Sequence, residues 1–173
     1  MKKVLILLAF ISMNANADYK VLNINTTLDL GELYKDSITS VEFSPAVLKL
    51  TSNQDKTKFD DAETKLIVET DIPFDSSVTD IPYVTKLTKN MSICTDYSGV
   101  SNDQDDFVQL TIDGQSISEG ESVSFSSFDL NDGVNKYSEH DIILSFKSFK
   151  DITTTGQPER CNGEIEFNIE VDI

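Results

Sequence analysis

The chain has 173 residues and a formal net charge of −16, because 30 acidic residues outnumber 14 basic ones. A surface this acidic repels phosphate backbones and anionic lipid headgroups, so nucleic acid is not expected as a partner. The charge fits two interpretations: it keeps an exported protein soluble, or it meets a basic partner.

The first 17 residues have the pattern of a secretory signal. Lys2 and Lys3 precede a short apolar run, residues 4–11, and the small residues Ala15 and Ala17 mark a cleavage site. The apolar run is too short to span a membrane. We therefore expect a signal peptide over residues 1–17, followed by a mature protein of one domain.

Apolar residues alternate with polar ones along most of the remaining chain, which predicts strands. Residues 18–31 form the first such stretch, and a second strand is expected at residues 65–70, where Pro73 follows. Later stretches alternate at Val108, Leu110 and Ile112, at Val123 and Phe125, and at Ile142, Leu144 and Phe146. Turn clusters separate these stretches, and no helix longer than about two turns is expected. The pattern predicts an all-β sandwich or barrel.

The tail, residues 164–173, alternates most regularly. One face carries Ile165, Phe167, Ile169, Val171 and Ile173, and the other carries Glu164, Glu166, Asn168, Glu170 and Asp172. This predicts a half-buried strand that ends on the last residue. A slip of one residue would bury acidic side chains, so the register should be well specified.

Cys94 and Cys161 are the only cysteines. In the oxidising compartment to which the signal directs the chain, two thiols usually form a disulfide, worth roughly 4 kcal/mol in the chain-entropy model. A reactive or intermolecular thiol is the alternative, but neither cysteine has a basic or histidine-rich neighbourhood.

Groups suited to catalysis are few. His140 is the only histidine, and its polar neighbours predict an exposed turn or strand-edge residue. Acidic residues 102–106 and 129–133 could offer oxygens to calcium, but neither has EF-hand spacing, so we expect solvated loops. No enzymatic motif is present, and we expect no catalytic residue, metal or cofactor.

Several stretches together resemble one family. Residues 20–29, KVLNINTTLD, resemble the N-terminal donor strand of class 5 (alpha-clade) chaperone-usher fimbrial subunits, the colonisation-factor pilins of enterotoxigenic bacteria. FSPA at 43–46, DGQSIS at 113–118 and GVNKYSEHDIILS at 133–145 agree in order, and Gly163 precedes the last apolar run. Cys161 stands where the family carries tyrosine, Thr26 stands where it carries alanine, and residues 51–106 match poorly.

The resemblance implies an immunoglobulin-like β-sandwich over residues 32–173 that lacks one strand. The N-terminal segment, residues 18–31, of another copy would complete it, using backbone hydrogen bonds and alternate side chains in pockets. The contacting residues would be Leu22, Ile24, Thr26, Leu28 and Leu30. The implied partners are further copies in a fimbrial polymer, a periplasmic chaperone, an outer-membrane usher, a tip adhesin and a host receptor. The implied route runs through the periplasm to the cell surface.

Two functions follow from different readings of residues 18–31. In the first, the chain is a structural subunit of an adhesive fimbria and the segment joins one copy to the next. In the second, the chain is a stand-alone secreted immunoglobulin-like binding module, an adhesin, and the segment completes its own sandwich.

Overall fold

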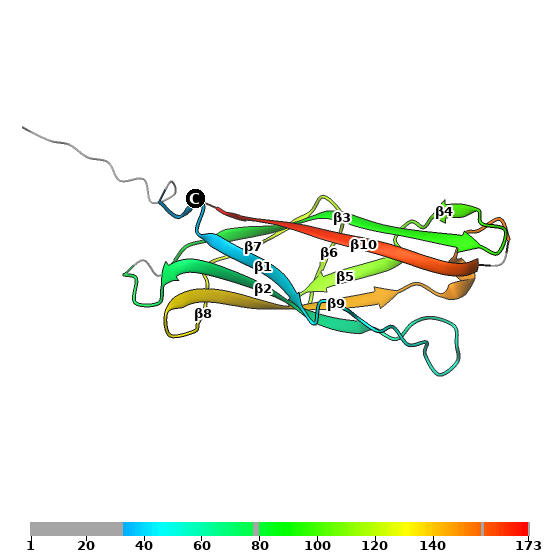
Figure 1. Ribbon diagram of the computed structural model, residues 1–173, viewed down its shortest axis with the longest axis horizontal. Coiled ribbons are helices and arrows are strands. Elements are labelled where there is room, and N and C mark those ends of the chain that lie inside the picture. Colours follow the sequence, from blue (N-terminus) through cyan, green and yellow to red (C-terminus); the bar gives the residue numbers. More distant parts are fainter. Residues whose placement is uncertain (1–32, 78–79, 157, 173) are drawn as a thin grey trace, which may run out of the picture.

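The computed structural model describes residues 33–77, 80–156 and 158–172 (Figure 1). The expected signal peptide and the segment 18–31 therefore lie outside the described residues. The elements of the described part are β1 (Ile38–Ser44), β2 (Ala62–Pro73), β3 (Tyr83–Asp96), β4 (Ser101–Asp103), β5 (Val108–Ile112), β6 (Gln115–Ile117), β7 (Ser122–Phe125), β8 (Leu130–Asn131), β9 (Asn135–Phe146), a 3-10 helix η1 (Phe149–Asp151) and β10 (Pro158–Val171).

The strands form two antiparallel sheets that face each other (Figure 1). The first sheet has the order β1-β2-β9-β5-β6, and β8 pairs with one end of β9. The second has the order β10-β3-β4, and β7 also pairs with β3. Two packed antiparallel sheets confirm the prediction of an all-β, immunoglobulin-like sandwich.

Alternating side chains from the two sheets form one core. In β2, Leu66, Val68 and Ile72 are buried, and β3 contributes Tyr83 and Leu87 from the facing sheet. This is the expected consequence of the period of two, which places every second residue of a strand on the inner face. The core therefore lies between the sheets along most of the long axis of the molecule.

The predicted strands are found, although some of their ends differ. The expected strand at residues 65–70 is part of β2, which continues to Pro73 because Ile72 still packs into the core. The tail strand starts earlier than expected, at Pro158, and ends at Val171, and Ile173 lies outside the described residues. No helix of the described residues is long and apolar enough to cross a membrane.

The prediction that His140 is exposed is wrong. His140 lies in the middle of β9 and is only 6% exposed. Its Nε2 lies 2.5 Å from the Tyr83 hydroxyl, its Nδ1 lies 2.7 Å from Oδ2 of Asp113, and its ring stacks on Phe125. Burial raises the pKa of the Tyr83 phenol, so Tyr83 stays protonated and can donate to His140. His140 thus links β9 of one sheet to β3 of the other.

Candidate functional site: the free edge of β10 and an apolar hollow

The last strand, β10, has a partner on one side only. It pairs with β3 along its whole length, whereas no strand of the described residues pairs with its other edge. A free edge presents unpaired backbone N–H and C=O groups, which can template an added strand. With 14 residues, β10 is also as long as β3, so this edge is extensive.

The inner face of β10 is only partly covered. Its apolar side chains, Ile165, Phe167, Ile169 and Val171, are half-buried and pack on the margin of the core. By contrast, Tyr83 and Leu87 on the neighbouring β3 are fully buried. The inner face of the second sheet is therefore fully buried at β3 and only partly buried at β10, the strand that forms the margin of this sheet.

β1 covers one half of this margin. It lies at the edge of the first sheet, beside β10 (Figure 1), and the rings of Phe43 and Phe167 are 6.1 Å apart between centroids. β1 ends at Ser44, after which the chain leaves the sheet and returns only at Ala62. The half of β10 that begins at Pro158 is therefore not covered by β1.

A hollow of about 610 Å³ lies beside that uncovered half. Its lining is mostly apolar and comes from both sheets and the connecting segments. The lining residues are Leu48, Leu50, Phe59, Ser92, Phe107, Val108, Leu144, Phe146, Phe149, Ile152, Glu159, Arg160, Cys161, Asn162, Gly163 and Ile165. A concave, largely apolar surface next to a free strand edge can bind an extended peptide through both backbone and side chains.

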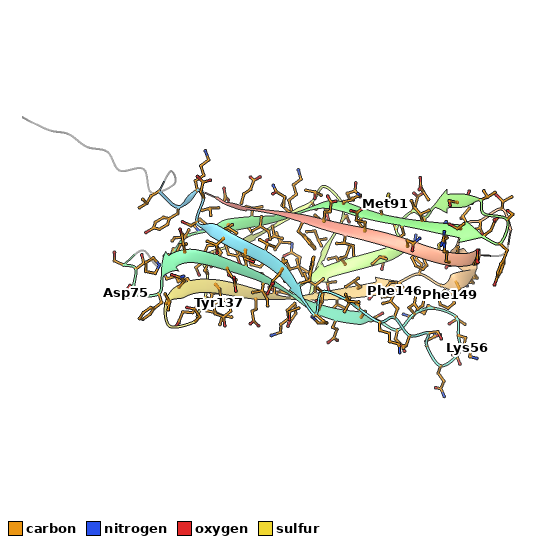
Figure 2. The ribbon with its side chains drawn as sticks, in the orientation of Figure 1. Lys56, Asp75, Met91, Tyr137, Phe146 and Phe149 are labelled. Atoms are coloured by element: carbon orange, nitrogen blue, oxygen red, sulfur yellow. A yellow bond between two sulfur atoms is a disulfide. The ribbon has the colours of Figure 1, made fainter. Side chains whose placement is uncertain are left out.

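Three aromatic rings form a fixed part of this lining. Phe59 meets Phe146 and Phe149 edge-on, at centroid distances of 5.4 and 4.9 Å. Figure 2 shows Phe146 and Phe149 on the same half of the molecule as the start of β10. The backbone N–H of Phe149 donates to the carbonyl of Thr57 at 2.7 Å, which ties the segment carrying Phe59 to η1. The hollow is therefore lined by rings whose positions are set by packing and hydrogen bonds.

The expected disulfide between Cys94 and Cys161 is present and joins β3 to β10. The two residues are directly opposite in the register, with Cα atoms 4.0 Å apart. In antiparallel sheets the closer pairs are those that do not exchange backbone hydrogen bonds, so the peptide groups of Cys161 point away from β3. The same orientation follows at every second residue, at Gly163 and Ile165, and these peptide groups therefore face the free edge.

Hydrogen bonds also hold the chain just before β10. Oδ2 of Asp96 accepts from the Gly156 N–H at 3.0 Å, and Oδ1 accepts from the Ser98 and Val100 N–H groups. These hydrogen bonds, with that of the Ser98 hydroxyl first among them, lower the pKa of Asp96. The start of β10 is thereby attached to the turn that follows β3.

Charge is unevenly distributed along the outer face of β10. Lys89 of β3 lies 2.6 Å from Glu164 and 3.6 Å from Glu166, and its hydrogen bond and charge lower the pKa of Glu164. Arg160, the only arginine of the chain, lies at the hollow end, and Glu170 lies at the opposite end. From Arg160 onward, the outer face thus carries one basic residue at the hollow end and acidic residues farther along.

The sequence predicted some residues of this site and missed others. Alternation in the tail correctly indicated the inner face of β10. Phe59 and Phe149, which line the hollow, were missed because they lie in irregular segments without a periodic signal. The candidate contact residues Leu22, Ile24, Thr26, Leu28 and Leu30 lie outside the described residues. The acidic residues 102–106 and 129–133 do not form, in the described part, a group of ligands that could hold a metal ion.

Comparisons with known proteins give a structural likeness but no sequence match. No family model and no curated protein sequence matches the chain. Among solved structures, the CooA pilin subunit from enterotoxigenic Escherichia coli aligns with a TM-score of 0.45 and 14% identity, over 78% of this chain and 100% of that chain. A likeness this distant does not specify a function.

Proposed function

We propose that the chain is a structural subunit of an adhesive fimbria and polymerises by strand donation. One observation carries the proposal: the free edge of β10 lies beside an apolar hollow and an inner face that is only half-buried. A strand inserted there would pair with the edge and cover that face. The segment 18–31 of another copy is suited to this role, since it alternates apolar and polar residues.

The energy available from such insertion is large. Burying Leu22, Ile24, Leu28 and Leu30 at about 1.5–3 kcal/mol each amounts to about 6–12 kcal/mol before ordering costs. A link of this strength rarely opens. No covalent chemistry is required, so the proposed role is not enzymatic and needs no cofactor.

Geometry favours a second copy as the donor over the chain's own segment. The described chain starts at Leu33, next to β1, and Figure 1 places the start of β1 beside the C-terminal end of β10. Residues 18–31 of the same chain could cover β10 only by running parallel to it, which pairs slightly less favourably than an antiparallel strand. The segment of another copy has no such restriction.

The proposal includes the partners and route that this assembly needs. Before assembly, the free edge of β10 and the hollow beside it are an aggregation hazard. A periplasmic chaperone would therefore cover them, and an outer-membrane usher would exchange the chaperone for the next subunit. The polymer would lie on the cell surface, where a tip adhesin and a host receptor would complete the attachment.

The test is the ladder of unboiled protein on an SDS gel after coexpression with chaperone and usher. We expect Leu22→Asp with Ile24→Asp to abolish the ladder, because both charges would be buried against the apolar inner face of the accepting copy. The matched control, Asn23→Lys with Asn25→Lys, adds as many charges on the opposite, polar face, which lies along the acidic outer residues of β10, and should retain the ladder. A ladder that persists in the first variant refutes strand donation. If deletion of residues 18–30 unfolds the isolated monomer, the result would support the stand-alone binding module instead.

A further inference from the structure

We propose that Arg160 of one copy pairs with Asp29 of the next copy and thereby sets the register of the donated strand. The inference rests on the proposed function. Its occupant is the segment 18–31 of a second copy, and its starting point is the distribution of charge along both strands.

The acceptor strand offers one basic group along its outer face. From Arg160 onward, β10 pairs with β3 without a register shift as far as Glu166, so its outer residues can be assigned without ambiguity. These residues are Arg160, Asn162, Glu164 and Glu166. Lys89 on β3 already neutralises the two glutamates from the other side. Arg160 is exposed, and the described residues show no ion pair to it.

The donor segment offers one acidic group in the corresponding set. If its even-numbered residues from Leu22 to Leu30 face the hollow, the outer positions are Tyr19, Val21, Asn23, Asn25, Thr27 and Asp29. Asp29 is the only acid among them. Opposite charges directly across two strands attract, whereas like charges repel.

This complementarity selects one direction and one alignment. With the strands antiparallel, Asp29 meets Arg160 at the hollow end, whereas a parallel strand would bring Asp29 among the glutamates of β10. Placing Asp29 opposite Arg160 then puts Leu28 opposite Cys161, Thr26 opposite Gly163 and Ile24 opposite Ile165.

Two independent features of the groove agree with this alignment. Cys161, Gly163 and Ile165 are the inward residues of β10 that line the hollow, so the three donor side chains would lie over it. Their peptide groups face the free edge, as the close approach of the two cysteines indicates. Gly163 has no side chain, which leaves room for the branched Thr26 at the middle of the donor.

Paired cysteines measure the register directly. In the proposed alignment Asn25 lies opposite Glu164, and a shift of two residues would place it opposite Glu166. Both glutamates are about half exposed, with side-chain exposures of 51% and 54%. A chain with Asn25→Cys and Glu164→Cys should form disulfide-linked polymers that survive boiling without reductant. Its matched control, Asn25→Cys with Glu166→Cys, should give at least about tenfold less, since cysteines a further two residues apart exceed the bonding distance.

Each outcome bears on one of the two proposals. A higher yield from the Glu166→Cys chain, or equal yields, overturns the register and leaves strand donation intact. A ladder of unboiled, reduced protein without cross-links in the Glu164→Cys chain also overturns the register. If neither chain forms that ladder while the single variants Asn25→Cys and Glu164→Cys fold, strand donation itself fails.

Charge reversal tests the ion pair separately. Arg160→Glu should slow ladder formation by about threefold or more, and Asp29→Lys in the same chain should restore the rate to within about twofold. Lys150→Glu removes another positive charge, from η1 next to Phe149, and should leave the rate unchanged. Absence of rescue in the double variant refutes the pairing of Arg160 with Asp29.

Discussion

Removing the disulfide should destabilise the sandwich and loosen the edge at which we propose assembly. Cys94 and Cys161 are 67 residues apart in the sequence. In the chain-entropy model, a loop of that length stabilises the folded state by about 4 kcal/mol. We therefore expect Cys94→Ala with Cys161→Ala to lower the free energy of unfolding by about that amount.

Urea unfolding followed by circular dichroism measures this change. With a slope of about 2 kcal/mol per molar urea, the midpoint should fall by about 2 M. Reduction of the wild-type protein should give a similar fall, which serves as the control for the alanine side chains. A midpoint within about 0.3 M of the wild type would show that the disulfide does not constrain the unfolded chain as reasoned. The ladder assay on the same variant would show whether the free edge of β10 still accepts a strand.

Three further predictions concern the core, acid sensitivity and the free edge. His140→Phe should cost about 1–3 kcal/mol in urea unfolding, because the buried Tyr83 hydroxyl loses its acceptor, and the cost should shrink when Tyr83→Phe is present. The pKa of the Asp96 carboxyl is lowered in the folded protein, so the charged carboxylate stabilises the fold above the ordinary carboxyl pKa of about 4. This stabilisation is lost as the pH falls through the folded value, and Asp96→Asn should therefore flatten the decline in stability below about pH 4. A copy of residues 18–30 joined after Ile173 by a short turn can run back along β10 as a hairpin, and it should yield a monomer on size-exclusion chromatography; persistent polymers would contradict this geometry.

The sequence predicted the strands best where one period of two continued over many residues. In β10, the regular spacing of Ile165, Phe167 and Ile169 identified both the strand and its inner face. His140 obeys the same rule, since it lies two residues before Ile142 on the inner face of β9. Its polar neighbours concealed this, and only the tertiary partners Tyr83 and Asp113 make its burial favourable.

The hollow could not be predicted in the same way. Phe59 and Phe149 come from segments with no sustained periodicity, and a bond between the Phe149 N–H and the Thr57 carbonyl brings those segments together. Their proximity depends on tertiary contacts between residues far apart in the sequence. Likewise, the sequence indicated that β10 is half-buried, but only the sheet order shows that the uncovered side is a free edge.

The position of this edge explains why strand donation would produce a linear polymer. The start of β1, from which the donor segment extends, lies at the C-terminal end of β10 (Figure 1). The hollow is lined by residues at the opposite end of the same strand, from Glu159 to Ile165. In the proposed antiparallel register, the end of the donor that carries Asp29 lies at the hollow, so the body of the donating copy would lie beyond that end. The accepting copy would extend its own segment from its other end. Because donor and groove are different surfaces, the contact is heterologous and leaves one of each free after every addition, so growth continues along the long axis instead of closing into a dimer.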